Sequence, residues 1–509
     1  MSSESQVSGS ALAALWSKPA KAVLTLAALI GAAYVIPGAQ KLRLLTPRAT
    51  SEQTAPAASD SAAAPVGEAK LVDETGDRPE MAVPDKVDVQ RAAPGLPDLP
   101  AEVETKAPPR PIEDPSGHAL DAFFTMLLRV ERKDPKAIAR IVHYGDSLLA
   151  VDLVTGTLRR QLQGRFGDAG HGYMPIANPW PGYFHNDVWR RASTEWTVSR
   201  VVGPFAPDGL YGLGGVTFIG RSRAAWSDFG TAKKGTFGVS ASKFGVQYLA
   251  QPGGGSFEVV IDKDREESVD TGADAPLLSE RVFEVPDGPH EFEVRVVKGP
   301  VRAFGTWLER DVPGVVLDSI GIQGARLRFL DQEDDAHWAR ALQMRKPTMV
   351  VFEFGLNEAA DGFAYPMDRY KETSLAVLSQ VRKAVPNASC LVIAPNDTAV
   401  KRGTSVVSRG VMPSLVSAQR EAAFESGCAF FDTFDAMGGV GSMATWVLRG
   451  LGQQDLTHPS TVGADVIGEW IYQAMMDRYR VFREGGGVMA AASARVAPAM
   501  SGATGMPAP

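Results

Sequence analysis

Cysteine is nearly missing from this sequence of 509 residues, which contains only Cys390 and Cys428. Two cysteines are too few for a disulfide scaffold or for a metal site built from cysteine ligands. Each of them begins an apolar run, and the two sulfurs come close if the runs form neighbouring parallel strands. We favour buried free thiols, although an oxidising compartment would permit a bridge.

A surplus of basic residues is also lacking. The sequence contains 52 Lys and Arg against 59 Asp and Glu, which gives a formal net charge of -7. A chain without a basic surplus displaces few counterions from a phosphate backbone, so nucleic acid is excluded as the main partner. The hydrophobic content of 44% is typical of globular proteins, and the length predicts more than one domain.

One uncharged stretch, residues 22–39, lies close to the N-terminus. At a rise of about 1.5 Å per residue, a helix of this length nearly crosses a bilayer. Basic residues stand on both sides of it, so charge does not fix its orientation. The stretch is either a cleaved signal peptide or an uncleaved membrane anchor. The long lead before it favours the anchor, and both interpretations predict export.

Composition divides the rest of the chain. A segment rich in Ala, Pro, Glu, Asp and Ser has no apolar period, which predicts a flexible tether. Further along, short alternating apolar runs separated by Pro and Gly turns predict an antiparallel β-sandwich. The expected order is an anchor or signal segment (1–45), a tether (46–115), a first α/β part (116–185), the sandwich (186–311), a second α/β part (312–483) and a disordered tail (484–509).

The two parts on either side of the sandwich share one pattern, in which apolar strands alternate with helices. This pattern predicts an α/β fold with a doubly wound parallel sheet of the flavodoxin-like type. The sandwich is therefore expected to be inserted into this domain and not appended to it.

A hydrophobic run over residues 141–144 ends in Gly145-Asp146-Ser147, and a helical pattern starts near Val154. This order predicts a strand, a tight turn and a helix, with Ser147 at the turn. There its hydroxyl projects above the carboxyl end of the sheet. Its backbone N–H is expected at the positive end of the helix, where it can stabilise an oxyanion. Ser147 is the candidate nucleophile, and Asp146 beside it is expected to cap the turn.

Two further stretches supply donors for an oxyanion. The strand over residues 349–354 ends in Gly355-Leu356-Asn357-Glu358, which puts the Asn357 carboxamide at the same edge of the sheet. Gly324 follows another extended segment, and the lack of a side chain allows its backbone N–H to approach a ligand closely.

An acid and a base lie three residues apart before the last helical pattern, at Asp455 and His458. This spacing allows Asp455 to orient the His458 ring while the other ring nitrogen faces Ser147. A second Asp-x-x-His, which ends at His337, lies inside an amphipathic helical pattern. We interpret it as a solvated helix face.

These blocks, in the order Gly-Asp-Ser-Leu, a lone glycine, Gly-x-Asn-Glu and Asp-x-x-His, resemble the SGNH (GDSL) hydrolase superfamily over about residues 118–480. The resemblance implies a catalytic triad and an oxyanion hole, with Glu358 where the family commonly has aspartate. The implied triad is Ser147, Asp455 and His458, and the implied oxyanion hole is Ser147, Gly324 and Asn357.

The inserted sandwich makes the chain similar to the bacterial peptidoglycan O-acetylesterase branch, in which that module resembles a carbohydrate-binding domain. This implies an exported serine esterase that removes O-acetyl groups from cell-wall or surface polysaccharide. Its location would be the bacterial inner membrane, facing the periplasm or cell wall, or outside the cell if the N-terminal segment is cleaved. The implied partner is an acylated polysaccharide or small ester, with no cofactor or metal. Two alternatives stay open: a polysaccharide O-acetyltransferase with the same triad, and a carbohydrate-binding or assembly protein with a vestigial triad.

Overall fold

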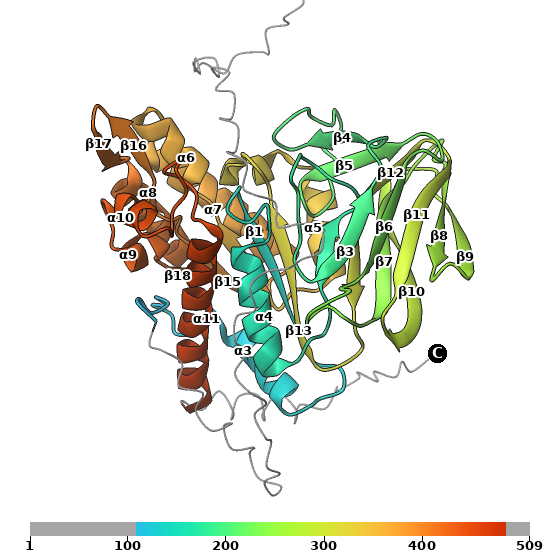
Figure 1. The fold of residues 1–509 in the computed structure, drawn as a ribbon, viewed down its shortest axis with the longest axis horizontal. Helices are drawn as coiled ribbons and strands as arrows, with labels where there is room; N and C mark the ends of the chain where they lie inside the picture. The colour runs from blue at the N-terminus through green and yellow to red at the C-terminus, as the bar shows by residue number, and fades with distance from the viewer. Residues whose placement is uncertain (1–107, 485–509) are drawn as a thin grey trace, which may run out of the picture. The chain divides into compact units, whose positions relative to one another are not determined.

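The computed structural model describes residues 108–484, which belong to one compact unit (Figure 1). The expected anchor or signal segment, most of the expected tether and the tail after residue 484 lie outside the described residues. Within residues 108–484, no helix combines the length and the apolar character needed to cross a bilayer.

Five parallel strands form the sheet of the α/β domain, which is built from the parts of the chain on either side of the sandwich. Their order across the sheet is β13, β1, β14, β15 and β18. Nearly every residue in them is buried, as expected for parallel strands that are covered on both faces. The strands span Ile138–Gly145 (β1), Gly314–Gly321 (β13), Met349–Glu353 (β14), Ser389–Ile393 (β15) and Ala429–Phe431 (β18).

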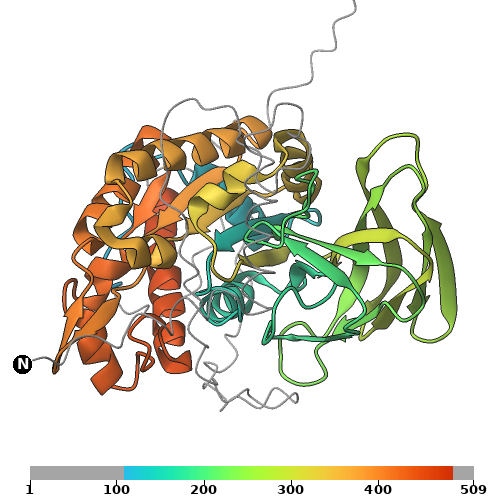
Figure 2. The same ribbon diagram turned by 90° about the horizontal axis from the view of Figure 1, so that it is seen from above.

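Helices cover both faces of this sheet (Figure 2). One face packs against α3 (Asp121–Glu131), α4 (Val154–Phe166) and α11 (Thr461–Glu484). The other packs against α5 (Asp335–Arg345), α7 (Met367–Ala384) and α8 (Met412–Glu425). The predicted doubly wound α/β fold is confirmed. Shorter elements at the edges are η2 (Leu327–Gln332), α6 (Leu356–Asp361), η3 (Gly362–Ala364), β16 (Ala399–Arg402), β17 (Ser405–Ser408), α9 (Thr433–Met437) and α10 (Ser442–Leu448).

Two antiparallel sheets form the inserted sandwich, which is drawn mostly in green in Figure 1. Their inward side chains share one apolar core. One sheet contains β4 (Thr197–Arg200), β5 (Val216–Gly220), β7 (Ala241–Ala250), β10 (Leu277–Gly288) and β12 (Val301–Glu309). The other contains β3 (Val188–Ala192), β6 (Trp226–Thr231), β8 (Ser256–Ile261), β9 (Arg265–Asp270) and β11 (Glu291–Lys298).

One strand joins the sandwich to the α/β domain. It lies before residue 186, where the sandwich is predicted to start. This strand is β2 (Gly172–Pro175), which pairs with β12 in an antiparallel register. The Tyr173 backbone N–H in β2 also donates to Asp318 Oδ1 on β13, at 2.7 Å. One short strand thus contacts both sheets, which fixes where the insertion leaves the α/β domain.

The last residues of the expected tether also make ordered contacts. Glu113 exchanges two backbone hydrogen bonds of 2.8 Å with Phe430 on the edge strand β18, and neighbouring Ile112 is buried. The side chain of Glu113 also forms an ion pair with Arg420. Order therefore begins before Ser116, because the free edge of the sheet provides backbone partners that composition does not reveal.

Cys390 and Cys428 form a disulfide, so the expected free thiols are wrong. The two strands involved, β15 and β18, are parallel neighbours in which Leu391 lies opposite Ala429. That register places the preceding cysteines opposite each other, with their Cα atoms 4.7 Å apart. A sequence shows which runs are strands but not the register between them, so it could not decide the bridge.

His337 lies on the predicted helix, α5, but it is not part of a solvated face. Its side chain is buried, and its ring packs edge-on against Phe304 of the sandwich, with centroids 5.3 Å apart. Asp334 accepts a hydrogen bond from the His337 backbone N–H and caps the helix. The inserted domain covers this helix face, which the isolated helical pattern could not show.

Candidate active site

Ser147 stands two residues after β1, an interior strand of the parallel sheet. A Cβ on Gly145 would lie 2.7 Å from the Glu353 carbonyl oxygen, so the strand must end in a glycine here. Successive turns follow, and α4 begins only at Val154. The expected position of the Ser147 N–H at a helix N-terminus is therefore wrong. Backbone bonds such as Leu149 N–H to Asp146 O hold these residues in turns before the helix starts.

Ser147, His458 and Asp455 form a continuous hydrogen-bonded chain. Ser147 Oγ lies 2.7 Å from His458 Nε2, and His458 Nδ1 lies 2.6 Å from Asp455 Oδ2. With the ring proton on Nδ1 donated to Asp455, Nε2 is free to accept the hydroxyl proton of Ser147. The His458 and Asp455 side chains are 24% and 36% exposed, so the chain of groups is reachable from solvent.

The loop before α11 is tied down on both sides of His458. Asp455 Oδ1 accepts the backbone N–H groups of Thr457 and His458, at 2.9 and 3.0 Å. From a neighbouring loop, Asn396 Nδ2 donates to the Thr457 carbonyl at 2.8 Å. Both oxygens of Asp455 are thus used to orient the loop and the ring, which limits how far the imidazole can swing.

The surroundings favour a charged imidazole next to an ionised acid. Burial acts against the charged form of His458, but the hydrogen bond and charge of Asp455, together with the charge of Asp146, raise the pKa of His458. Burial also acts on Asp455, yet its hydrogen bonds from His458 outweigh it and lower the pKa of Asp455. Asp455 therefore stays ionised at neutral pH and stabilises a proton on His458.

Gly324 and Asn357 come from different elements and lie beside one another. Asn357 Nδ2 on α6 donates to the carbonyl of Ala325, at 2.8 Å. Gly324 has a φ of +78°, which favours glycine, and nothing lies within 4 Å of where its Cβ would be. Two residues earlier, the Ile322 N–H donates to the carbonyl of Gly145, at 2.9 Å. The segment that carries Gly324 is therefore attached to the strand that leads to Ser147.

Asp146 caps the turn, as predicted. Its Oδ1 accepts the Leu148 N–H at 3.0 Å, and its Oδ2 accepts the Leu356 N–H at 3.2 Å. The second bond ties the serine turn to the first residue of α6, next to Asn357. Burial raises the pKa of Asp146 to about 6.

Sequence reasoning missed a buried network next to the serine turn. Asp152, which is fully buried, binds the guanidinium of Arg159 on α4 through both carboxylate oxygens, at 3.0 and 2.7 Å. The same carboxylate accepts the Asn186 backbone N–H at 2.9 Å. Nearby, His171 Nε2 lies 2.9 Å from His185 Nδ1 inside the protein. The spacing of Asp152 and Arg159, seven positions apart, is only a weak sequence signal for this pair. A bend before α4 breaks the helical spacing that would otherwise relate the two residues.

The described residues contain no group of three or more His, Cys, Asp or Glu side chains that could hold a metal ion. The arrangement of groups around Ser147 is that of an acid, a base and a hydroxyl with amide donors nearby. Such a set can carry out acyl transfer with its own side chains.

The sequence model of the GDSL-like Lipase/Acylhydrolase family matches residues 291–466. This range includes Gly324, Asn357, Asp455 and His458, whereas Ser147 precedes it. No curated protein matches the sequence.

Two of the matching solved structures are esterases. A peptidoglycan O-acetylesterase has a TM-score of 0.61 and 22% identity, covering 72% of this chain and 99% of its own. A family two carbohydrate esterase from Cellvibrio japonicus has a TM-score of only 0.24 and 11% identity, covering 60% of this chain and 98% of its own. The first likeness shows a shared fold, and the family match covers the candidate site residues other than Ser147. The match over residues 291–466 to the GDSL-like lipase/acylhydrolase family, together with the shared fold, therefore supports an ester-hydrolysing enzyme.

Proposed function

We propose that the protein is an exported serine esterase that removes O-acetyl groups from cell-wall or surface polysaccharide through an acyl-serine intermediate. The observation that carries this proposal is the chain of two short hydrogen bonds from Ser147 through His458 to Asp455. In it the nucleophile, the base and the acid that orients the base stand in the order that acyl transfer requires.

In the first half of the reaction, His458 Nε2 takes the hydroxyl proton as Ser147 Oγ bonds to the acetyl carbonyl carbon. Negative charge then develops on the carbonyl oxygen. The N–H groups of Ser147 and Gly324 and the Asn357 amide are the proposed donors to it. Collapse of this intermediate breaks the bond to the sugar oxygen, which receives the proton from His458. Asp455 stays ionised and stabilises the imidazolium while it exists.

In the second half, water attacks the acetyl-serine. His458 removes a proton from that water and returns it to Ser147 Oγ, so acetate leaves and the enzyme is restored. The acceptor is the only difference between an esterase and a transferase. A sugar hydroxyl in place of water would give the same atoms and residues a transferase activity.

The substrate class rests on the similarity in fold to a peptidoglycan O-acetylesterase over 99% of that chain. Export is supported by the disulfide between Cys390 and Cys428, because such bonds persist mainly outside the reducing cytosol. Attachment to the membrane through residues 22–39 belongs to the same proposal. Separation of membrane and soluble fractions, with and without those residues, tests it.

The decisive experiment measures acetate released from O-acetylated peptidoglycan. We expect release by the native protein and a fall of at least about 10⁴-fold in the Ser147→Ala variant, because removing the nucleophile leaves only binding and oxyanion stabilisation. The control is the same polymer after mild base treatment, which removes ester-linked but not amide-linked acetyl groups.

Three results would contradict the proposal in different ways. Full release by Ser147→Ala would show that Ser147 is not the nucleophile. Loss of acetyl groups from the donor with their recovery on an added glycan acceptor, and not as acetate, would identify a transferase. Binding of the polymer with neither outcome would identify a binding protein.

A further inference from the structure

The segment that carries Gly324 is tied to α6 by three side chains of that one short helix. Asn357 donates to the Ala325 carbonyl, at 2.8 Å. Glu358 Oε1 accepts the Leu327 backbone N–H, at 2.9 Å. At the end of the helix, Asp361 pairs with Arg326 through both carboxylate oxygens, at 2.7 and 2.8 Å. Three successive residues, 325 to 327, are therefore held by one helix.

Glu358 differs from the other two because it is almost fully buried, with 1% of its surface exposed. Its Oε2 has no hydrogen-bond partner among residues 108–484. Burial, helped by the nearby charge of Asp146, raises the pKa of Glu358 to about 7. A buried carboxyl with one unsatisfied oxygen lowers stability. Its hydrogen bond from the Leu327 N–H is therefore the candidate for a compensating role.

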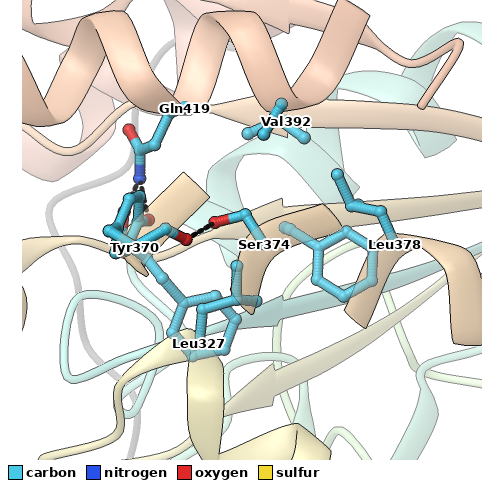
Figure 3. Close-up of a pocket in the computed structure, with 9 residues that line it drawn as sticks. Leu327, Tyr370, Ser374, Leu378, Val392 and Gln419 are labelled. Carbon is cyan, nitrogen blue, oxygen red and sulfur yellow. Dashed lines mark hydrogen bonds between the residues drawn. The ribbon is translucent and has the colours of Figure 1, made fainter. Parts of the chain in front are cut away.

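Leu327 is also anchored through its side chain. It lines a cavity of about 10 Å³ behind the segment, together with residues of the sheet, α7 and α8 (Figure 3). The wall is fixed by Gln419, whose Nε2 donates to Tyr370 Oη at 2.8 Å and to the Phe354 carbonyl at 2.7 Å. A space of this size holds about one water molecule at most, so the Leu327 side chain has little room to move.

We propose that Glu358 is a positioning residue for the oxyanion-binding segment, which it fixes by holding the Leu327 N–H against the helix that also carries Asn357. This inference rests on the proposed function. Donors from two separate elements, Gly324 on the segment and Asn357 on α6, must meet at one oxygen atom. A bond that joins these two elements sets the distance between their donors.

The proposal makes a specific kinetic demand. The oxyanion exists only after Ser147 has attacked, so its donors bind the transition state more strongly than the substrate. Misplacing one donor should then lower kcat and leave KM nearly unchanged. A general loss of structure would instead lower the fraction of folded enzyme, without changing kcat per folded molecule, or would raise KM.

The first test compares Glu358→Ala with Glu358→Gln on a soluble acetyl ester. The alanine removes the acceptor, and we expect kcat to fall on the order of 10- to 100-fold with KM within about twofold. The glutamine keeps an acceptor oxygen at the same position, so its kcat should stay within about threefold of the native value. Ser147→Ala is measured beside them.

A second pair removes the donor of the same bond, in case Glu358→Ala does not fold. Leu327 is the first residue of η2, and Arg326 before it is extended, with φ -107° and ψ 152°. Both conditions suit a proline, which lacks the N–H. Leu327→Pro should lower kcat about as much as Glu358→Ala does. Leu327→Ala, which trims the side chain but keeps the N–H, should lower it several-fold less.

The outcomes separate this inference from the proposed function. If Ser147→Ala retains activity, the proposed function fails and the inference fails with it. If Ser147→Ala is inactive while Glu358→Ala and Leu327→Pro keep their kcat, only the inference is overturned. It is likewise overturned if Glu358→Gln loses as much kcat as Glu358→Ala, because the acceptor would then not be what matters.

Discussion

Two groups of buried carboxyl side chains lie at the same parallel sheet, and they differ in whether they pair with arginine. The first group, called the edge cluster, lies near Ser147, and within residues 108–484 none of its members forms an ion pair with Lys or Arg. The second group, called the junction cluster, lies where the sandwich strand β12 meets β1 and β13, and each of its carboxylates is paired with arginine. The edge cluster is Asp146, Glu353 and Glu358, and the junction cluster is Glu309 and Asp318 with Arg140 and Arg345.

The pKa values of Asp146 and Glu358 in the edge cluster shift in the opposite direction to that of Glu309 in the junction cluster. Burial raises the pKa of Asp146 to about 6 and that of Glu358 to about 7. Burial acts on Glu309 as well, but the charges of Arg140 and Arg345 outweigh it and hold the pKa of Glu309 at about 2. Buried acids without a Lys or Arg partner lower stability and are typical of functional sites, whereas those paired with arginine hold elements together. We infer that the edge cluster serves the reaction and the junction cluster fixes the insertion.

The largest effect expected is on activity and comes from the site beside the edge cluster. Asp455→Asn should lower kcat about 10⁴-fold, because an amide at this position favours the wrong tautomer of His458. The free energy of unfolding should change little, since Asp455 is 36% exposed. Hydrolysis of a soluble acetyl ester and denaturant unfolding measure the two quantities. A stable variant with native kcat would remove Asp455 from the mechanism.

The reverse result is expected at the junction. Arg345 is 3% exposed and binds Asp318 at 2.8 Å and Glu309 at 2.6 Å. Arg345→Met should lower the free energy of unfolding by about 3–5 kcal/mol, because buried Asp318 loses its arginine partner and Glu309 keeps only Arg140. The kcat of the folded enzyme should stay close to native. If kcat instead falls as far as it does in Asp455→Asn, the junction is not separate from the catalytic edge.

A smaller effect, which depends on pH, should distinguish the clusters by sign. The folded pKa of Glu358 lies above its ordinary value of 4.5, so folding retains a proton that the unfolded chain releases. Between pH 4.5 and about 7 this group lowers stability as the pH rises. Glu358→Gln should therefore gain about 1–3 kcal/mol relative to the native protein across that window. Unfolding of both proteins at pH 4.5 and 8 checks this.

For Glu309 the sign is opposite. Its folded pKa is held below the ordinary value, so its contribution is present above pH 4.5 and is lost as the pH falls toward 2. Relative to the native protein, Glu309→Gln should thus be least stable at neutral pH. A Glu358→Gln variant whose relative stability does not change with pH would contradict the raised pKa.

The sequence predicted the architecture because the relevant patterns are local. The alternation of strand and helix patterns predicted the parallel sheet, and the short apolar runs separated by Pro and Gly turns predicted the sandwich. Motif order also predicted which residues come together, since Ser147, His458 and Asp455 are within hydrogen-bond distance. Their chemical roles remain predictions.

What the sequence did not predict depends on contacts between elements. The disulfide required the register of β15 against β18, and the covered His337 required the position of the sandwich. Glu358 was noted only as a replacement for aspartate, because its bond to Leu327 joins two loops with no shared pattern. Capping by Asp146, a local contact, was predicted correctly.

The smallest expected effect comes from an arginine that is exposed. Arg281 on the sandwich is 53% exposed and pairs with Glu267 at 2.7 Å, a distance similar to those of the Arg345 pairs. Water and salt screen such a pair, so Arg281→Met should cost less than about 1 kcal/mol in denaturant unfolding. Arg281→Met is therefore the matched control for Arg345→Met, with the same atoms removed. Equal losses in the two variants would mean that burial is not what makes the junction arginine important, and the contrast between the clusters would then rest on activity alone.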